Sequence, residues 1–208
     1  LRKSERSGQN YAVTTHVVMN NPRWEHVSRG GSLGADQKVL SCDERFGDQE
    51  LYAAAAGSKL ATTGVTEFEL MIVKSKNNSG GGMLLGVIED VGFRSAGETN
   101  WGRVWGLTPW NGRAFSFPHG DSRGASRAGE RPGDAVMQGD CRRGADGTIV
   151  RVRVDSSRRQ LWFKVESSQP TRASAVEQDW VLAQDGGQPL VLPLDVAFRP
   201  FARCAHLG

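Results

Sequence analysis

Hydrophobic and polar residues alternate strictly along one stretch in the second half of the chain. In Ile149–Asp155, three valines alternate with two arginines. Because successive side chains of a β-strand point to opposite faces, this pattern predicts a strand with one buried and one solvent-facing side. Ser156–Arg159 is typical of a turn, and Gln160–Val165 alternates again, so the two runs predict an antiparallel hairpin. Asp155 stands where its carboxylate can accept N–H groups of that turn.

The other apolar runs are also short and are separated by turn residues. Val65–Val73 alternates in the same way, whereas Met83–Ile88 is apolar throughout, which predicts a central strand covered on both faces. Val104–Leu107 and Ala114–Phe117 flank an Asn-Gly pair, a strong signal for a hairpin. Two last strands are expected at Leu190–Val196 and Phe201–His206, and the polar start offers an edge strand at Val13–Val18.

The composition agrees with many strands joined by turns. Twenty-six of the 208 residues are glycine and eight are proline. A helical bundle rarely tolerates so much glycine, because each interior glycine costs about 0.5–1 kcal/mol relative to alanine. About ten short strands in one chain predict an all-β fold, a two-sheet antiparallel β-sandwich. The length suits one domain, expected over residues 20–208, with residues 1–19 as a loose arm or edge strand.

Several of these runs occur in the order of a known family pattern. The matching segments are Gly64–Leu70, Leu85–Ile88, Trp105–Leu107 with Gly112, Gly133-Asp134, Val152–Asp155 with Gln160–Phe163, and Leu192–Val196. In this order the sequence resembles a SPRY (B30.2-like) domain, whose fold is a concanavalin-like jelly roll. Phe68 stands where the family usually has Trp, and residues 119–147 are rich in insertions.

The resemblance implies a module that binds a partner protein or short peptide with loops at one end of the sandwich. By their order, those loops are Ala54–Ser58, Asn77–Gly82, Phe93–Arg103 and Ala197–Pro200. It also implies an intracellular, cytoplasmic location and a monomeric domain of a larger protein or complex, such as an adaptor. We see no secretory signal in the sequence, which agrees with this expectation.

Aromatic and arginine side chains on these loops are the candidate partner-binding residues, because such side chains dominate binding hot spots. Three are expected to supply apolar anchors and three to pair with acidic or carbonyl groups. The anchors are Phe93, Trp101 and Phe198, and the cations are Arg94, Arg103 and Arg199. Trp110 in the hairpin and Asn78 extend the set. Three of the four aromatics have an alternative role: Trp101 could cap the core, Phe198 could lie inside it, and Trp110 could pack on its own hairpin.

Catalytic, cofactor and metal sites are not expected. The four histidines stand in unrelated contexts, and no nucleophile, zinc or phosphate-loop motif occurs. The three cysteines are widely spaced without a C-x-x-C pair. Neighbours on a strand point to opposite faces, so Asp43-Glu44 and Glu89-Asp90 do not form an acid–base dyad. No apolar run approaches the roughly 20 residues that cross a bilayer. We therefore expect no enzyme and no membrane segment.

Two other functions remain as alternatives. The Arg-rich loop 119–147 could associate with nucleic acid, although the net charge is only +3 and no aromatic platforms are interleaved with its arginines. Nucleic acid is therefore not the favoured partner. A sandwich of this kind can also bind glycans, and Asp90 with Asn100-Trp101 are the residues for such a site.

Overall fold

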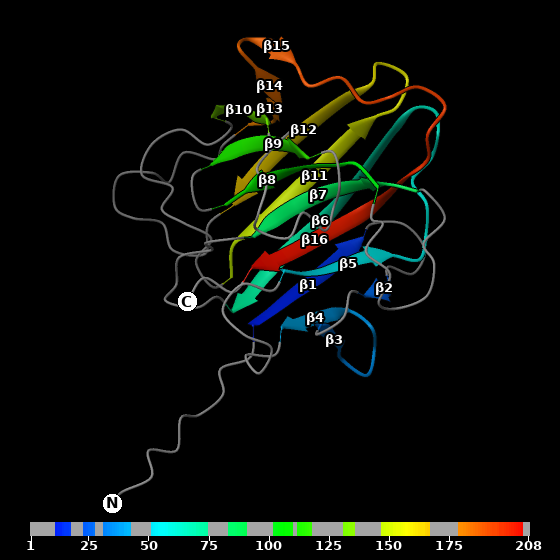
Figure 1. The fold of residues 1–208 in the computed structure, drawn as a ribbon, viewed down its shortest axis with the longest axis vertical. Helices are drawn as coiled ribbons and strands as arrows, with labels where there is room; N and C mark the ends of the chain where they lie inside the picture. Colours follow the sequence, from blue (N-terminus) through cyan, green and yellow to red (C-terminus); the bar gives the residue numbers. More distant parts are fainter. Residues whose placement is uncertain are drawn as a thin grey trace, which may run out of the picture.

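The computed structural model is an all-β sandwich of two antiparallel sheets packed face to face (Figure 1). It describes residues 11–17, 23–27, 31–42, 51–74, 83–90, 102–109, 112–117, 131–135, 147–166 and 179–205. Within these ranges each main sheet has seven strands, and a hairpin of β14 (Gln184–Asp185) and β15 (Gln188–Pro189) forms a third, two-stranded sheet. The predicted fold class is confirmed.

Sheet A has the strand order β13-β12-β11-β6-β1-β4-β3. Its strands are β1 (Tyr11–Val17), β3 (Gly31–Leu33), β4 (Val39–Cys42), β6 (Val65–Lys74), β11 (Ile149–Asp155), β12 (Gln160–Glu166) and β13 (Val181–Leu182). The predicted hairpin is confirmed in register, because Ile149 lies opposite Glu166 and Asp155 opposite Gln160. As expected, the Asp155 carboxylate accepts a turn N–H, from Arg158 at 2.9 Å.

Sheet B has the strand order β10-β9-β8-β7-β16-β5-β2. Its strands are β2 (Trp24–Val27), β5 (Leu51–Ala56), β7 (Leu84–Glu89), β8 (Val104–Thr108), β9 (Arg113–Phe117), β10 (Arg131–Ala135) and β16 (Phe198–Ala205). Strands β8 and β9 form the hairpin that the Asn-Gly pair predicts, with Val104 opposite Phe117.

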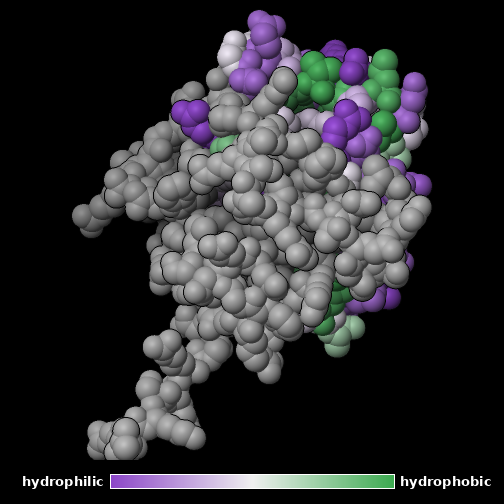
Figure 2. Space-filling view, viewed as in Figure 1, coloured by the Kyte–Doolittle hydropathy of each residue, from purple (hydrophilic) through white to green (hydrophobic). Residues whose placement is uncertain are grey.

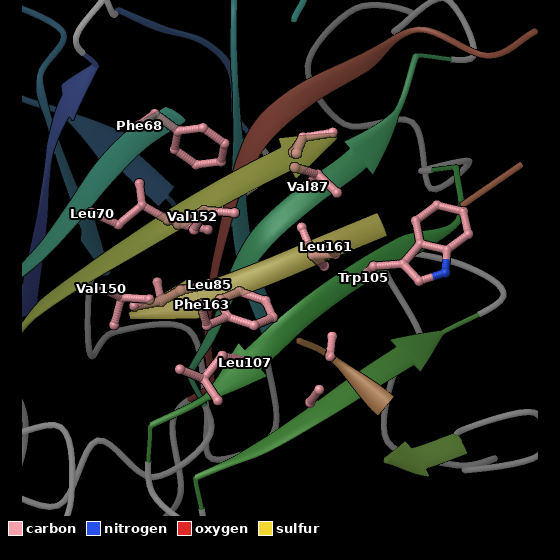
Figure 3. Packing of buried hydrophobic residues seen from close by; sticks show 14 of the residues in the cluster. Phe68, Leu70, Leu85, Val87, Trp105, Leu107, Val150, Val152, Leu161 and Phe163 are labelled. Carbon is pink, nitrogen blue, oxygen red and sulfur yellow. The ribbon is translucent and has the colours of Figure 1, made fainter. Parts of the chain in front are cut away.

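The core lies between the sheets and is built by alternate residues of their strands. Sheet A contributes apolar side chains from β6, β11 and β12, and sheet B contributes them from β7, β8 and β16. Figure 3 shows the two sets facing each other, for example Phe163 of sheet A near Leu85 and Leu107 of sheet B. The strict alternation of burial along β11 and β12 is therefore the direct result of their sequence pattern.

Sheet B is apolar on its outer face as well. Leu84 and Ile88 of β7 point away from the inter-sheet core and form a second cluster with Val104, Phe115 and Phe201. All of these side chains are buried. The prediction that Met83–Ile88 is covered on both faces is thereby confirmed.

Four local expectations are wrong. Strand β1 is not an edge strand, because it pairs with β6 on one side and β4 on the other. Phe198–Pro200 is not a loop, since β16 begins at Phe198 and pairs with β7 from that residue. Residues 190–197 form no strand. Part of the expected long loop, Arg131–Ala135, is strand β10 on β9.

Candidate functional site

Two non-strand segments cross one end of the sandwich and connect its two sheets. The first, residues 57–64, leads from β5 in sheet B to β6 in sheet A. The second, residues 190–197, leads to the start of β16. We call this end the loop end; it also contains the β11–β12 turn (156–159), Asp90 directly after β7, and Gly102 and Arg103 directly before β8. Both segments are visible at the upper right of Figure 1.

Hydrogen bonds hold residues 57–64 to both sheets. At the sheet B side, the Leu60 N–H donates to the Phe198 carbonyl at 2.7 Å. At the sheet A side, the Ser156 hydroxyl donates to the Ala61 carbonyl at 2.8 Å, and the Gly64 N–H donates to the Ser157 hydroxyl at 3.0 Å. The segment is therefore fixed at both ends, as a rigid recognition surface requires.

Residues 190–197 are fixed in the same way. The Leu192 N–H donates to the Arg159 carbonyl at 3.0 Å, and Arg159 Nε donates back to the Leu192 carbonyl at 2.6 Å. At the other side, the Asp90 N–H donates to the Ala197 carbonyl at 2.8 Å. The Leu190 N–H also donates to the Ala183 carbonyl at 2.8 Å, and on the segment held in this way Val191 and Leu194 are more than half exposed. Figure 2 shows hydrophobic residues next to hydrophilic ones in the upper part of the molecule, where these segments lie.

A buried carboxylate stands where β7 ends. Asp90 binds Lys59 Nζ at 2.5 Å and Arg199 Nε at 3.1 Å. Burial by itself raises the pKa of Asp90, but hydrogen bonds from Lys59 and Arg199, together with their charges, outweigh burial and hold the pKa below its usual range. Arg199 also donates to the carbonyls of Ala56 and Gly57, beyond the last β16–β5 pair. One arginine thus connects β16, β7 and β5.

The neighbouring residue, Glu89, forms a two-point ion pair with Arg103. Arg103 Nε donates to one carboxylate oxygen at 2.9 Å and Nη2 to the other at 3.0 Å. The side-chain hydrogen bonds from Arg103 lower the pKa of Glu89. The guanidinium also lies over the ring of Trp105, 5.6 Å from its centroid.

His26 on β2 lies near the Asp90 group. Burial lowers the pKa of His26, and the positive charge of Arg199 lowers it further, against smaller opposing effects of Glu25 and Asp90. The imidazole is therefore less readily protonated than an exposed one. Among the described residues, no group of three or more His, Cys, Asp and Glu side chains is placed to hold a metal ion.

Three of the predicted binding residues lie in the described part of the chain. Arg103 is exposed at the loop end, as expected for a binding residue. Phe198, in contrast, is only 6% exposed and meets Trp105 edge to face at 5.7 Å between ring centroids. The expectation of an exposed Phe198 anchor is wrong, because this residue faces the core at the start of β16. Arg199 is also buried, and its guanidinium binds Asp90 rather than facing solvent.

The other five predicted residues, Asn78, Phe93, Arg94, Trp101 and Trp110, lie outside the described residues.

Sequence reasoning missed Lys59, Val191 and Leu194 as site residues. No local pattern distinguishes Lys59, since its partner Asp90 is 31 positions away. The Val-Leu-Pro-Leu run was expected to be a strand, and its exposure depends on hydrogen bonds with Arg159. Asp90, an expected glycan-binding residue, is instead occupied by two cations.

Comparisons with known proteins agree with this architecture. In sequence, no family model and no curated protein matches the chain. In structure, it is similar to the SPRY domain of human HERC1, with 13% sequence identity and a TM-score of 0.51. The chain has the SPRY fold. The similarity covers 88% of this chain and 89% of that domain. The resemblance stated from the sequence motifs is confirmed at the level of the fold.

No helix in the described part of this SPRY-like domain could span a membrane.

Proposed function

We propose that this SPRY-like domain is a non-catalytic protein-interaction module that binds a partner protein or peptide at its loop end. The observation that carries the proposal is the exposure of Val191 and Leu194 on a segment whose backbone is hydrogen-bonded at both sides. Val65, at the start of β6, is a third exposed apolar side chain at this end. Apolar groups on a fixed backbone bind with little loss of conformational entropy, which favours recognition.

Residues 93, 94 and 101 belong to the same proposal. They stand in the connection between Asp90 and Gly102, both of which the structure places at the loop end. Arg103, at the end of that connection, is held by Glu89 and is exposed. Trp101, two positions before Arg103 in the sequence, is proposed as a contact residue for the same partner, because aromatic and arginine side chains dominate binding hot spots.

The test compares two substitutions of exposed apolar residues. Leu194→Asp changes the loop end, whereas Val73→Asp changes an exposed valine at the far end of β6. Both variants and the wild type are used as baits in nuclease-treated lysate, and captured proteins are quantified. We expect a protein captured by the wild type and by Val73→Asp but not by Leu194→Asp, with Trp101→Ala reducing capture of the same protein. Equal capture by all four baits would place the binding surface elsewhere and overturn the proposal.

A further inference from the structure

Three ion pairs at the loop end share one orientation, with the cation outside and the carboxylate inside. The side chains of Lys59 and Asp90 are 56% and 7% exposed, and those of Arg103 and Glu89 are 48% and 14% exposed. For Arg158 and Asp155 the values are 76% and 13%. A partner that approaches this end therefore meets positive charge first, and the neutralising charge lies beneath it.

The outer face of sheet A shows that this orientation is not general. There, Glu67 is more exposed than its partner Arg153, and Glu166 is more exposed than Lys164. Arg151 is shared by two carboxylates that are themselves partly exposed. On that face positive and negative groups are equally accessible, so it presents no charge preference to a partner.

The other charged groups at the loop end do not reverse the preference. Arg23, whose carbonyl binds the Gly57 N–H, adds a fourth exposed cation, and Lys38 adds a fifth, next to Gln37, whose carbonyl binds the Trp24 N–H. Glu25, Asp36 and Asp195 are exposed acidic residues of the described part of this end, and Asp185 is exposed on the adjoining β14–β15 hairpin. Five exposed cations therefore stand beside four exposed anions, so the preference comes from the outward position of the three paired cations and not from an excess of positive charge.

The cations are spaced along the segment that crosses the loop end. Lys59 lies on residues 57–64, next to Asp90, and Asp90 adjoins the Glu89–Arg103 pair. Gly64, five residues further along, binds Ser157, the neighbour of Arg158. Five residues span at most about 18 Å, which is the length of an extended peptide of about six residues. One short peptide can therefore reach Lys59 and Arg158 together.

We propose that the loop end recognises an acidic peptide segment that carries an apolar side chain. Its carboxylates approach the exposed heads of Lys59, Arg103 and Arg158, and its apolar side chain packs on Val191 and Leu194. The proposal rests on the protein-binding function proposed above and adds the chemistry of the partner. A nucleic acid fits less well, because three aromatics described at this end, Trp24, Trp105 and Phe198, are buried and offer no face for base stacking.

The probe is a set of synthetic octapeptides that each contain one leucine, in three backgrounds: aspartate and glutamate, glutamine, or lysine. A single-stranded oligouridine of 12 nucleotides serves as the phosphate probe. Binding of each to the wild-type chain is measured by fluorescence anisotropy at two salt concentrations. We expect acidic peptides to bind at least about fivefold more tightly than glutamine peptides, and the difference to shrink at high salt.

Two charge reversals locate the binding. Arg158→Glu changes the loop end, and Arg113→Glu makes the same change of net charge at the opposite end of sheet B. We expect Arg158→Glu to weaken binding of acidic peptides about fivefold or more, and Arg113→Glu to alter it less than twofold. Glutamine or lysine peptides could instead bind as tightly as the acidic ones, with Leu194→Asp abolishing this binding. That result would overturn the acidic preference but leave the protein-binding function intact. Preference for oligouridine, or no binding sensitive to either loop-end variant, would overturn both.

Discussion

Arg199 Nε donates to Asp90 Oδ1 at 3.1 Å, and the two side chains are buried together at the end of sheet B. Nη1 of the same guanidinium donates to the carbonyls of both Ala56 and Gly57. β16 carries Pro200, which has no N–H, and its pairing with β5 begins only at Phe201. Arg199 thus binds the Ala56 and Gly57 carbonyls beyond the point where the β16–β5 pairing starts, and it fixes the beginning of the 57–64 segment.

Removing this arginine is expected to destabilise the fold. Arg199→Met leaves the buried Asp90 paired with Lys59 and removes the Arg199 donor from the carbonyls of Ala56 and Gly57. Breaking a buried pair on one side costs about 3–5 kcal/mol, and the exposed Lys59 head offsets part of it. We predict a loss of about 2–4 kcal/mol in the free energy of unfolding, measured by urea titration. Arg158→Met, at an exposed pair, is the control and should change stability by less than about 0.5 kcal/mol.

Acid should weaken the same end of the molecule. The pKa values of Glu89 and Asp90 are both lower in the folded chain than in the unfolded chain. Their contribution to stability is therefore present above the unfolded pKa values, near pH 4, and is lost as the pH falls through the folded values. We predict that unfolding free energy falls below about pH 4, and that Glu89→Gln makes this fall shallower. A wild-type stability that is flat between pH 5 and pH 2.5 would contradict the prediction.

The sequence predicts those parts of the fold that depend on local periodicity. In β11 and β12 the alternation of valine with arginine determines the buried face, and the length of the turn determines the register. In β7 the unbroken apolar run predicts burial on both sides, which the two clusters around Leu85 and Leu84 confirm. Strand β1 could not be placed in this way, because its central position depends on pairing with residues far along the chain.

The loop end was predicted only in part for the same reason. The sequence around a charged residue does not show which residue will be its ion-pair partner, or which of the two side chains will be the more exposed. The pairs of Lys59 with Asp90 and of Arg103 with Glu89 are separated by 31 and 14 positions. The order of the family pattern predicts a loop at Phe198-Arg199-Pro200, whereas these residues begin strand β16 and pair with β7.

The burial of Phe198 gives a prediction that separates stability from binding. Its ring packs against Trp105 in the core, so Phe198→Ala should cost about 3–4 kcal/mol in unfolding free energy. The milder Phe198→Leu should cost about 1–2 kcal/mol and leave a folded chain. We expect folded Phe198→Leu to bind the acidic peptides described above within twofold of wild type. A large loss of affinity in this folded variant would restore Phe198 as a contact residue.

Gly86 and Gly106 lie opposite each other on β7 and β8, and they do not have equal tolerance for a side chain. A Cβ on Gly86 would meet the backbone oxygen of Trp105 and lie 2.6 Å from the Gly106 Cα, and neither atom can move without separating the strands. A Cβ on Gly106 would meet the Leu84 side chain, which can shift, and the Leu85 carbonyl, both at 2.9 Å. We predict that Gly86→Ala lowers unfolding free energy by about 3 kcal/mol and Gly106→Ala by about 1–2 kcal/mol.

The control is Gly34→Ala, where the nearest neighbour of the added Cβ would be at 3.4 Å. Its unfolding free energy should stay within about 0.5 kcal/mol of wild type in the same urea titration. Equal losses at Gly86 and Gly34 would show that the close approach of β7 and β8 is not what requires glycine at position 86.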